Sequence, residues 1–304
     1  KPYFDPEDLQ LSVENSVRNR REDTSHAEEF NRAYDTIYYA GNPWSIHVDT
    51  TEMRSLRPGT LAKVFSRQFS DMSKADIFIT SDQSESVIEE LVCKYLASLP
   101  SKSVALAHAG PLLPAFKGDV TLDRTYPKEN VDRSVCDVAW RTKIKPTQLN
   151  ECAIEALDYI LSKRYLNEIR EDKGGTYTIR FSTDYDAANK GVTVSSVAFE
   201  TKPDISKGLI SDVKDIFADF CQSGPTEAET AEAKAYLKKK YLEYRDRCDE
   251  NVLYKNAEVI SFIAEAEINA DYVRELEKMT SKLILKTAKK IHKGSTLTTI
   301  YTQK

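Results

Sequence analysis

The sequence predicts an α+β protein. Runs of residues with helical spacing occupy both ends of the chain, short β-prone runs in the middle include an antiparallel hairpin, and the order of elements occurs twice. The 304 residues are 40% hydrophobic and 30% charged, with a net charge of −5. This composition is typical of a globular protein with a buried core, and the length suggests two domains at about 150 residues each.

Helices dominate the first hundred residues. Asp5 and Pro6 form a helix start, after which Leu9, Val13 and Val17 recur every four residues. The other elements predicted in this part are a helix from about residue 25 to residue 40, two helical pieces over 51–70, a strand over 75–80 and a helix over 84–99.

A loop-rich passage, Gly-Pro-Leu-Leu-Pro at 110–114, is the best candidate for a linker. We therefore divide the chain into a first part at 1–110, a linker at 111–118 and a complete domain at 119–304. The elements predicted after the linker are strands over 119–144, a helix over 146–171, hairpin strands over 176–183 and 191–200, helices over 204–221, 226–247, 250–267 and 281–292, and a closing strand over 296–302.

The internal repeat has a period of about 220 residues. A helical run that begins at Glu52 leads to a strand at 77–79, and a similar run that begins at Glu275 leads to a strand at 299–301, an offset of 223 or 222 residues. A full first copy would need strands before Lys1. We therefore expect the first part to be the second portion of a truncated domain with an incomplete sheet.

The residues form no complete catalytic or metal site. The segment closest to an inverted zinc motif, H-x-x-E-H, is His26-Ala27-Glu28-Glu29-Phe30, in which phenylalanine replaces the second histidine. The other histidines, His47, His108 and His292, lie far from it in the sequence. The five cysteines form no C-x-x-C pair, and no nucleotide-binding glycine motif precedes a helix. We therefore predict no metal ligand and no bound cofactor in this chain.

Charge and hydrophobicity exclude two further classes. A chain with a net negative charge is a poor candidate for nucleic-acid binding, which depends on Lys and Arg meeting phosphates. No apolar run approaches the roughly 18 residues of a membrane span. The compartment stays open: a bacterial protein of this kind would be periplasmic or cytoplasmic.

The most informative segment is Leu166–Tyr177, Leu-Asn-Glu-Ile-Arg-Glu-Asp-Lys-Gly-Gly-Thr-Tyr. It resembles the L-R-E-x-x-G-G-x-Y signature of the pitrilysin/insulinase family of zinc metallopeptidases, with Ile169 in place of the usual leucine. The turn at Gly41-Asn42-Pro43-Trp44 and the helix start at Gly224-Pro225-Thr226-Glu227-Ala228-Glu229 also resemble segments of that family. The resemblance covers essentially the whole chain.

The resemblance implies repeated α/β sandwich domains, each with an antiparallel-rich mixed sheet covered by helices, arranged in two halves around a chamber. In the family, the first half binds zinc, and the second half has lost the ligands but contributes an arginine and a tyrosine to the active site. Arg170 and Tyr177 have the same seven-residue spacing. Their implied role is to bind the substrate backbone and support the tetrahedral oxyanion. The residues alone leave another interpretation, in which Arg170 pairs with Glu168 or Asp172 and Tyr177 packs on the sheet.

Two functions follow from the resemblance. In the first, the chain is the C-terminal non-catalytic half of a zinc metalloendopeptidase and is inactive alone. Its partners would be a peptide substrate and the N-terminal catalytic half of the same protein, or a separate catalytic subunit, and zinc would belong to that half. In the second, the chain is a non-catalytic structural or partner subunit of the processing-peptidase or respiratory-complex core type.

Overall fold

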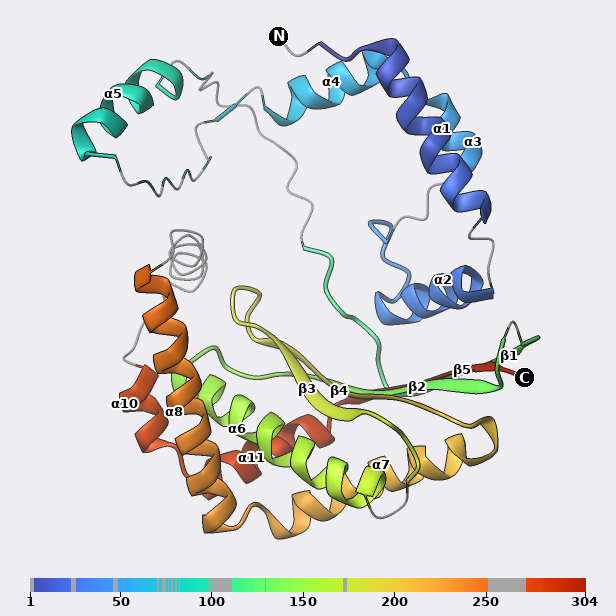
Figure 1. The fold of residues 1–304 in the computed structure, drawn as a ribbon, viewed down its shortest axis with the longest axis vertical. Helices are drawn as coiled ribbons and strands as arrows, with labels where there is room; N and C mark the ends of the chain where they lie inside the picture. Colours follow the sequence, from blue (N-terminus) through green and yellow to red (C-terminus); the bar gives the residue numbers. More distant parts are fainter. Residues whose placement is uncertain are drawn as a thin grey trace.

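The computed structural model describes residues 3–22, 26–45, 49–69, 71–72, 75, 77, 79, 81, 83–97, 99, 111–128, 130–171, 174–250 and 272–304. A sheet covered by helices forms the lower part of the molecule in Figure 1, and a group of N-terminal helices lies above it. The helix predicted over 250–267 falls, apart from its first residue, outside the described residues.

The sheet has five strands in the order β1-β5-β2-β4-β3. β1 and β5 are parallel, and all other neighbours are antiparallel. This confirms the predicted α+β class with an antiparallel-rich mixed sheet. The strands are β1 (Asp119–Tyr126), β2 (Arg133–Lys143), β3 (Ile179–Asp186), β4 (Val192–Thr201) and β5 (Ser295–Gln303).

One face of the sheet packs against three helices, α6 (Gln148–Tyr165), α7 (Ser206–Ser223) and α11 (Ser281–His292) (Figure 1). Side chains alternate between the two faces of a strand, so Cys136, Val138 and Trp140 all point from β2 into this main core. The Trp140 ring lies 4.9 Å from the Phe217 ring of α7. Two further helices, α8 (Glu227–Glu250) and α10 (Tyr272–Lys278), pack beside α6.

The opposite face of the sheet is covered at one end by α2 (His26–Tyr38) and by residues 114–116. Arg141 on β2 donates hydrogen bonds to the carbonyl oxygens of Pro114, at 2.6 Å, and Phe116, at 3.1 Å. The Phe116 side chain is buried between α2 and the sheet. The segment expected to be a linker therefore packs on the sheet, and the boundary proposed at 111–118 separates two parts that share a contact surface.

The remaining N-terminal helices lie away from the sheet in Figure 1. They are α1 (Pro6–Glu22), α3 (Thr50–Ser55), α4 (Pro58–Gln68) and α5 (Glu85–Tyr95). The strand predicted over 75–80 is wrong at its described residues, because Ala75, Ile77 and Ile79 have no regular secondary structure. A strand is stabilised by hydrogen bonds to a neighbouring strand. All five described strands belong to the sheet formed by residues after 118.

The repeat is visible in the helices. α3 and α4 begin at residues 50 and 58, and α10 and α11 begin at residues 272 and 281, which are 222 and 223 positions later. The two copies differ in burial. Thr287 and Ala288 of α11 are buried, whereas the residues 223 positions earlier, Val64 and Phe65 of α4, are 53% and 37% exposed. Among the residues that the structure describes, the helices of the first copy therefore lack the covering layer that α6 and α7 give the second.

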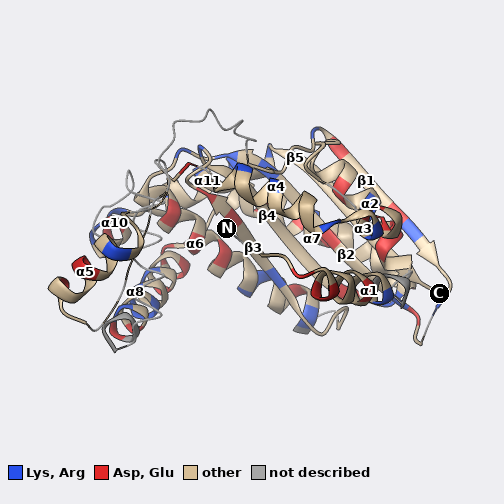
Figure 2. Ribbon diagram, turned by 90° about the horizontal axis from the view of Figure 1, so that it is seen from above, with Lys and Arg blue, Asp and Glu red and all other residues tan. Residues whose placement is uncertain are grey.

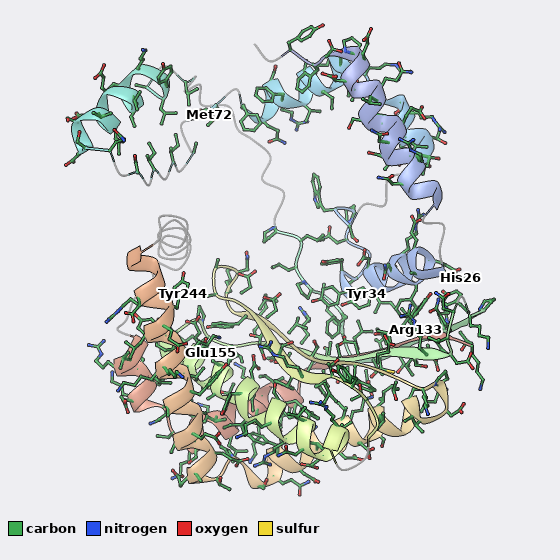
Figure 3. All side chains as sticks on the ribbon, in the orientation of Figure 1. His26, Tyr34, Met72, Arg133, Glu155 and Tyr244 are labelled. Carbon is green, nitrogen blue, oxygen red and sulfur yellow. The ribbon has the colours of Figure 1, made fainter. Side chains whose placement is uncertain are left out.

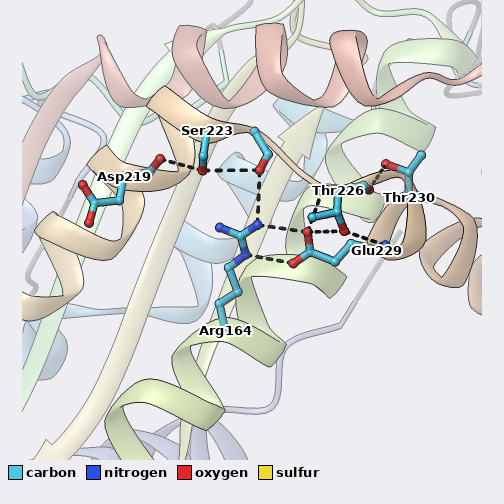
Figure 4. Close-up of polar contacts among 7 residues, drawn as sticks. Arg164, Asp219, Ser223, Thr226, Glu229 and Thr230 are labelled. Atoms are coloured by element: carbon cyan, nitrogen blue, oxygen red, sulfur yellow. Dashed lines mark hydrogen bonds and ion pairs between the residues drawn. The ribbon is translucent and has the colours of Figure 1, made fainter.

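The segment Gly224–Glu229 ties the start of α8 to α6 (Figure 4). The Glu229 amide donates to the Thr226 hydroxyl, and the Thr226 amide donates to the Glu229 carboxylate, which is a capping box. Arg164 of α6 donates two parallel hydrogen bonds to Glu229, both at 2.9 Å, and a third to the Gly224 carbonyl. Burial raises the pKa of Glu229, but the hydrogen bonds from Arg164 and Thr226 outweigh it, so the pKa lies below its ordinary value.

We predict that Glu229→Ala lowers the free energy of unfolding by about 2–3 kcal/mol at pH 7, because it removes a helix cap and a charge-assisted pair. A carboxylate with a lowered pKa stabilises the fold above its ordinary pKa of 4.5, so the difference from the wild type should shrink as the pH falls through the lowered value. Urea unfolding at pH 7 and pH 3.5 measures both effects. Glu232→Ala, which removes a more exposed carboxylate three residues on, should have a much smaller effect; equal losses would contradict the assignment.

Candidate functional site

Arg170 lies in η1 (Leu166–Glu171), a π-helical turn that continues α6. The turn ends at two glycines: the amide of Gly174 donates to the Arg170 carbonyl at 3.0 Å, and the amide of Gly175 donates to the Ile169 carbonyl at 3.1 Å. Gly174 has φ +58°, in the left-handed region that favours glycine. The first glycine of the pair therefore turns the chain at the end of this helical segment, where its amide bonds back to Arg170.

The second glycine allows the chain to pass close to α7. A Cβ atom at Gly175 would lie 2.7 Å from Cδ2 of Leu209, which is buried. The Thr201 hydroxyl donates to the Gly175 carbonyl at 2.5 Å, and the Thr176 hydroxyl donates to the Glu200 carbonyl at 2.7 Å. These contacts with the end of β4 fix the backbone immediately before Tyr177.

Tyr177 projects into solvent with 83% of its surface exposed. The Arg170 guanidinium lies 5.5 Å from the centre of its ring, within cation–π distance. The structure thus brings the two predicted site residues together and does not pack Tyr177 on the sheet. Both side chains have donor groups, and both are exposed.

A cavity of about 540 Å³ lies beside Tyr177. It is formed by the turn before β3, the start of β2 and the end of β4. Its lining residues are Val131, Asp132, Arg133, Gly174, Gly175, Thr176, Tyr177, Thr178, Glu200, Thr201, Lys202 and Ile205. Arg170 is not among them, so the pair lies at the edge of the cavity, with the tyrosine on its wall.

A second cavity of about 580 Å³ lies between α6, β3 and α8. Asp158 lines it and accepts hydrogen bonds from the Thr183 amide and hydroxyl, at 2.9 and 2.6 Å. Burial raises the pKa of Asp158 to about 7, although the bonds from Thr183 lower it. Ser162 both donates to the Phe181 carbonyl and accepts from its amide, so the two α6 side chains occupy the outer edge of β3.

Sequence reasoning missed Asp158 and Ser162. Asp158 and Ser162 are polar residues four positions apart, so they lie on the same side of the helix. Their place among the apolar residues of the inward-facing side is the signal that could have found them. An unpaired strand edge is a site for pairing with other chains, and side chains that occupy its amides protect it. Their geometry therefore fits protection of the β3 edge.

The histidines and cysteines of the described residues do not gather. His26 stacks on Tyr126 with ring centres 4.7 Å apart, and His292 meets Phe217 edge to face. His47 and His108 lie outside the described residues. Within the described ranges, no three His, Cys, Asp or Glu side chains are placed to hold a metal ion, and the thiols of Cys93, Cys136, Cys152 and Cys221 are free. No helix in this part of the chain is both long and apolar enough to cross a membrane.

Comparison with known families gives the identity. The sequence model of the family described as the peptidase M16 inactive domain matches residues 60–237, more than half of the chain. The chain belongs to this family. The resemblance to pitrilysin/insulinase peptidases drawn from Leu166–Tyr177 is thereby confirmed.

Solved structures share the fold of this M16 inactive domain. The periplasmic protease PqqL from Escherichia coli matches with a TM-score of 0.80 and 18% identity, over 99% of this chain and 33% of PqqL. The ferredoxin protease FusC, solved with Arabidopsis ferredoxin, matches with a TM-score of 0.79 and 15% identity, over 100% of this chain and 33% of the FusC chain. A peptidase M16 inactive domain from Pseudomonas fluorescens matches with a TM-score of 0.73 and 16% identity, over 100% of this chain and 72% of the other.

These identities are low enough that the similarity shows the fold alone. The M16 inactive domain described here spans about one third of the length of the PqqL and FusC chains. No curated protein matches its sequence.

Proposed function

We propose that this M16 inactive domain is the C-terminal non-catalytic half of a zinc metalloendopeptidase. It forms part of the substrate chamber and supplies Arg170 and Tyr177 to the active site. The observation that carries the proposal is the exposed Tyr177 ring beneath the Arg170 guanidinium, at the wall of a cavity of about 540 Å³.

The chemistry follows from the donors that the pair provides. A carbonyl oxygen gains negative charge when its carbon becomes tetrahedral during hydrolysis, and a phenol or guanidinium placed beside it stabilises that charge. Tyr177 donates one hydrogen bond, and the planar guanidinium of Arg170 donates several in a fixed geometry. The turn at Gly174 and Gly175 fixes where the tyrosine stands.

The described residues of this chain do not fit a zinc ion. The segment closest to a zinc motif places Phe30 where a ligand is needed, and that side chain is buried against Tyr301. Zinc, which would supply the activated water, therefore belongs to a partner polypeptide in this proposal. No step of the reaction is assigned to a metal in this chain.

The uncovered N-terminal helices support such a partner. Large apolar side chains are exposed there, among them Leu11, Val64, Phe69, Leu91 and Tyr95. On α4 the exposed side chains are close together, with the rings of Phe65 and Phe69 centred 4.6 Å apart, and these helices lie away from the sheet (Figure 3). A group of exposed apolar side chains marks a surface that another polypeptide can cover. We infer that the partner is the N-terminal catalytic half of the same protein, or a separate catalytic subunit.

A mixing experiment tests the proposal. The chain and the separately produced N-terminal half should each fail to cleave an unfolded, fluorogenic peptide, and the mixture should cleave it in a reaction that a zinc chelator stops. Chelator-sensitive cleavage by this chain alone would contradict the proposal. A stable mixture without cleavage would favour the alternative, a non-catalytic partner or structural subunit.

A further inference from the structure

α11 carries a row of lysines along its outer surface. Its apolar side chains Ile284, Ala288 and Ile291 are fully buried in the main core. The exposed lysines follow a spacing of four, seven, eight and eleven residues from the first, which places them on one side of the helix. This lysine face consists of Lys282, Lys286, Lys289, Lys290 and Lys293, and it is about 16 Å long at 1.5 Å per residue.

The lysine face carries five positive charges within about 16 Å. Among the described residues, none of its five ammonium groups takes part in a hydrogen bond or an ion pair. Lysines on α8 differ: Lys238 pairs with Glu277 at 3.2 Å, and Lys239 pairs with Glu243 at 3.8 Å.

Like charges three and four residues apart destabilise a helix, whereas the helix dipole favours positive charge in the last turn and at the C-cap, where Lys289, Lys290 and Lys293 lie. The whole chain has a net charge of −5, so the remainder carries −10 when the +5 of the lysine face is set apart. The row is therefore a local concentration of positive charge on an acidic protein; Figure 2 colours Lys and Arg along the ribbon.

We propose that the lysine face is a docking surface for a membrane that contains anionic phospholipids. A cluster of four to eight basic residues on a helix is attracted to anionic headgroups without any insertion. Insertion is not available to α11, because its apolar face is already occupied by the protein core. The helix would lie on the headgroups, with the sheet above it.

The composition of the surface favours lipid over a protein partner. The centre of a protein interface is rich in aromatic and apolar residues and poor in lysine. The exposed large hydrophobic side chains of the described residues include none on α11 or on its neighbour α7. A surface that offers only flexible point charges fits a fluid array of headgroups, which needs no fixed complementary shape.

Vesicle sedimentation tests the proposal directly on this chain. We expect binding to vesicles of 70% phosphatidylcholine and 30% phosphatidylglycerol at 50 mM NaCl, at least tenfold weaker binding at 500 mM NaCl, and none to pure phosphatidylcholine. A variant with Lys282→Gln, Lys286→Gln, Lys289→Gln and Lys293→Gln should bind at least tenfold more weakly. All four positions are exposed, and circular dichroism checks that the variant is folded.

A matched control removes the same number of charges from α8, with Lys234→Gln, Lys238→Gln, Lys239→Gln and Lys240→Gln, and should bind within about twofold of the wild type. Equal loss in both variants would show that only net charge matters and would overturn the proposal. So would equal binding to both vesicle types, or binding to polyglutamate or duplex DNA at 50 mM NaCl without binding to the anionic vesicles.

Discussion

Tyr177→Phe is expected to lower kcat of the assembled peptidase about a hundredfold and to leave its zinc content unchanged. The substitution removes one hydroxyl that lies in solvent at the wall of the cavity, so the fold loses no buried contact. Loss of one donor to a developing oxyanion costs roughly 10²–10³ in kcat. Because the interaction forms mainly in the transition state, KM should change little. Steady-state kinetics and metal analysis of the reconstituted enzyme measure the three quantities.

Tyr236→Phe is the matched control, because it removes the hydroxyl of another exposed tyrosine on α8, where it lines the second cavity. Its kcat should equal that of the wild type. Arg170→Lys should give an intermediate loss, since the charge stays but the planar fork is lost. If Tyr177→Phe has the kcat of the wild type, the tyrosine does not support the oxyanion and its proposed role is wrong.

The proximity of Arg170 and Tyr177 was predictable because its signal is local. Arg170 and Tyr177 are seven residues apart, and the turn that joins them is built from neighbours, with Gly174 at positive φ. The role of Gly175 was not predictable in the same way. Its requirement for glycine comes from Leu209, which lies 34 positions further along the chain and meets it only when α7 packs on the sheet.

The hairpin and the long helices were predictable for a similar reason. β3 and β4 are joined by a short turn, and apolar spacing within each helix marks its buried face. The strand order was not predictable from such patterns: β5, the last strand in the sequence, inserts between β1 and β2, which are adjacent in the sequence. Its neighbours are chosen by contacts across about 170 residues, for instance between Ser134 and Thr302.

The described residues of the strand predicted over 75–80 show the limit of local propensity. Ile77-Phe78-Ile79 is a compact β-prone run in the sequence, but Ile77 and Ile79 are each about half exposed. In the second copy, the equivalent strand β5 has hydrogen-bonded neighbours on both sides. A β-prone segment forms a strand only where neighbouring strands are available to pair with it. The same sequence signal therefore gives different structures in the two copies.

Val64→Asp combined with Phe65→Ser should have opposite effects on the isolated chain and on the assembled protein. Their counterparts in the second copy, Thr287 and Ala288, are buried in the helix layer that covers the sheet. In the isolated chain, the double variant removes exposed apolar surface, so binding of a hydrophobic dye and self-association should fall. The free energy of unfolding measured on the sheet domain should change by less than about 0.5 kcal/mol.

In the assembled protein, the same two changes should remove roughly 3–6 kcal/mol of apolar burial, which weakens association with the N-terminal half by about a hundredfold or more. Titration calorimetry on the two halves measures this loss. Ser66→Asp is the control, because its counterpart 223 residues later is Lys289, which is exposed in the covered copy. It should leave both states unchanged. If the double variant associates as tightly as the wild type, this side of α4 stays in solvent, and the repeat does not predict which surface the partner covers.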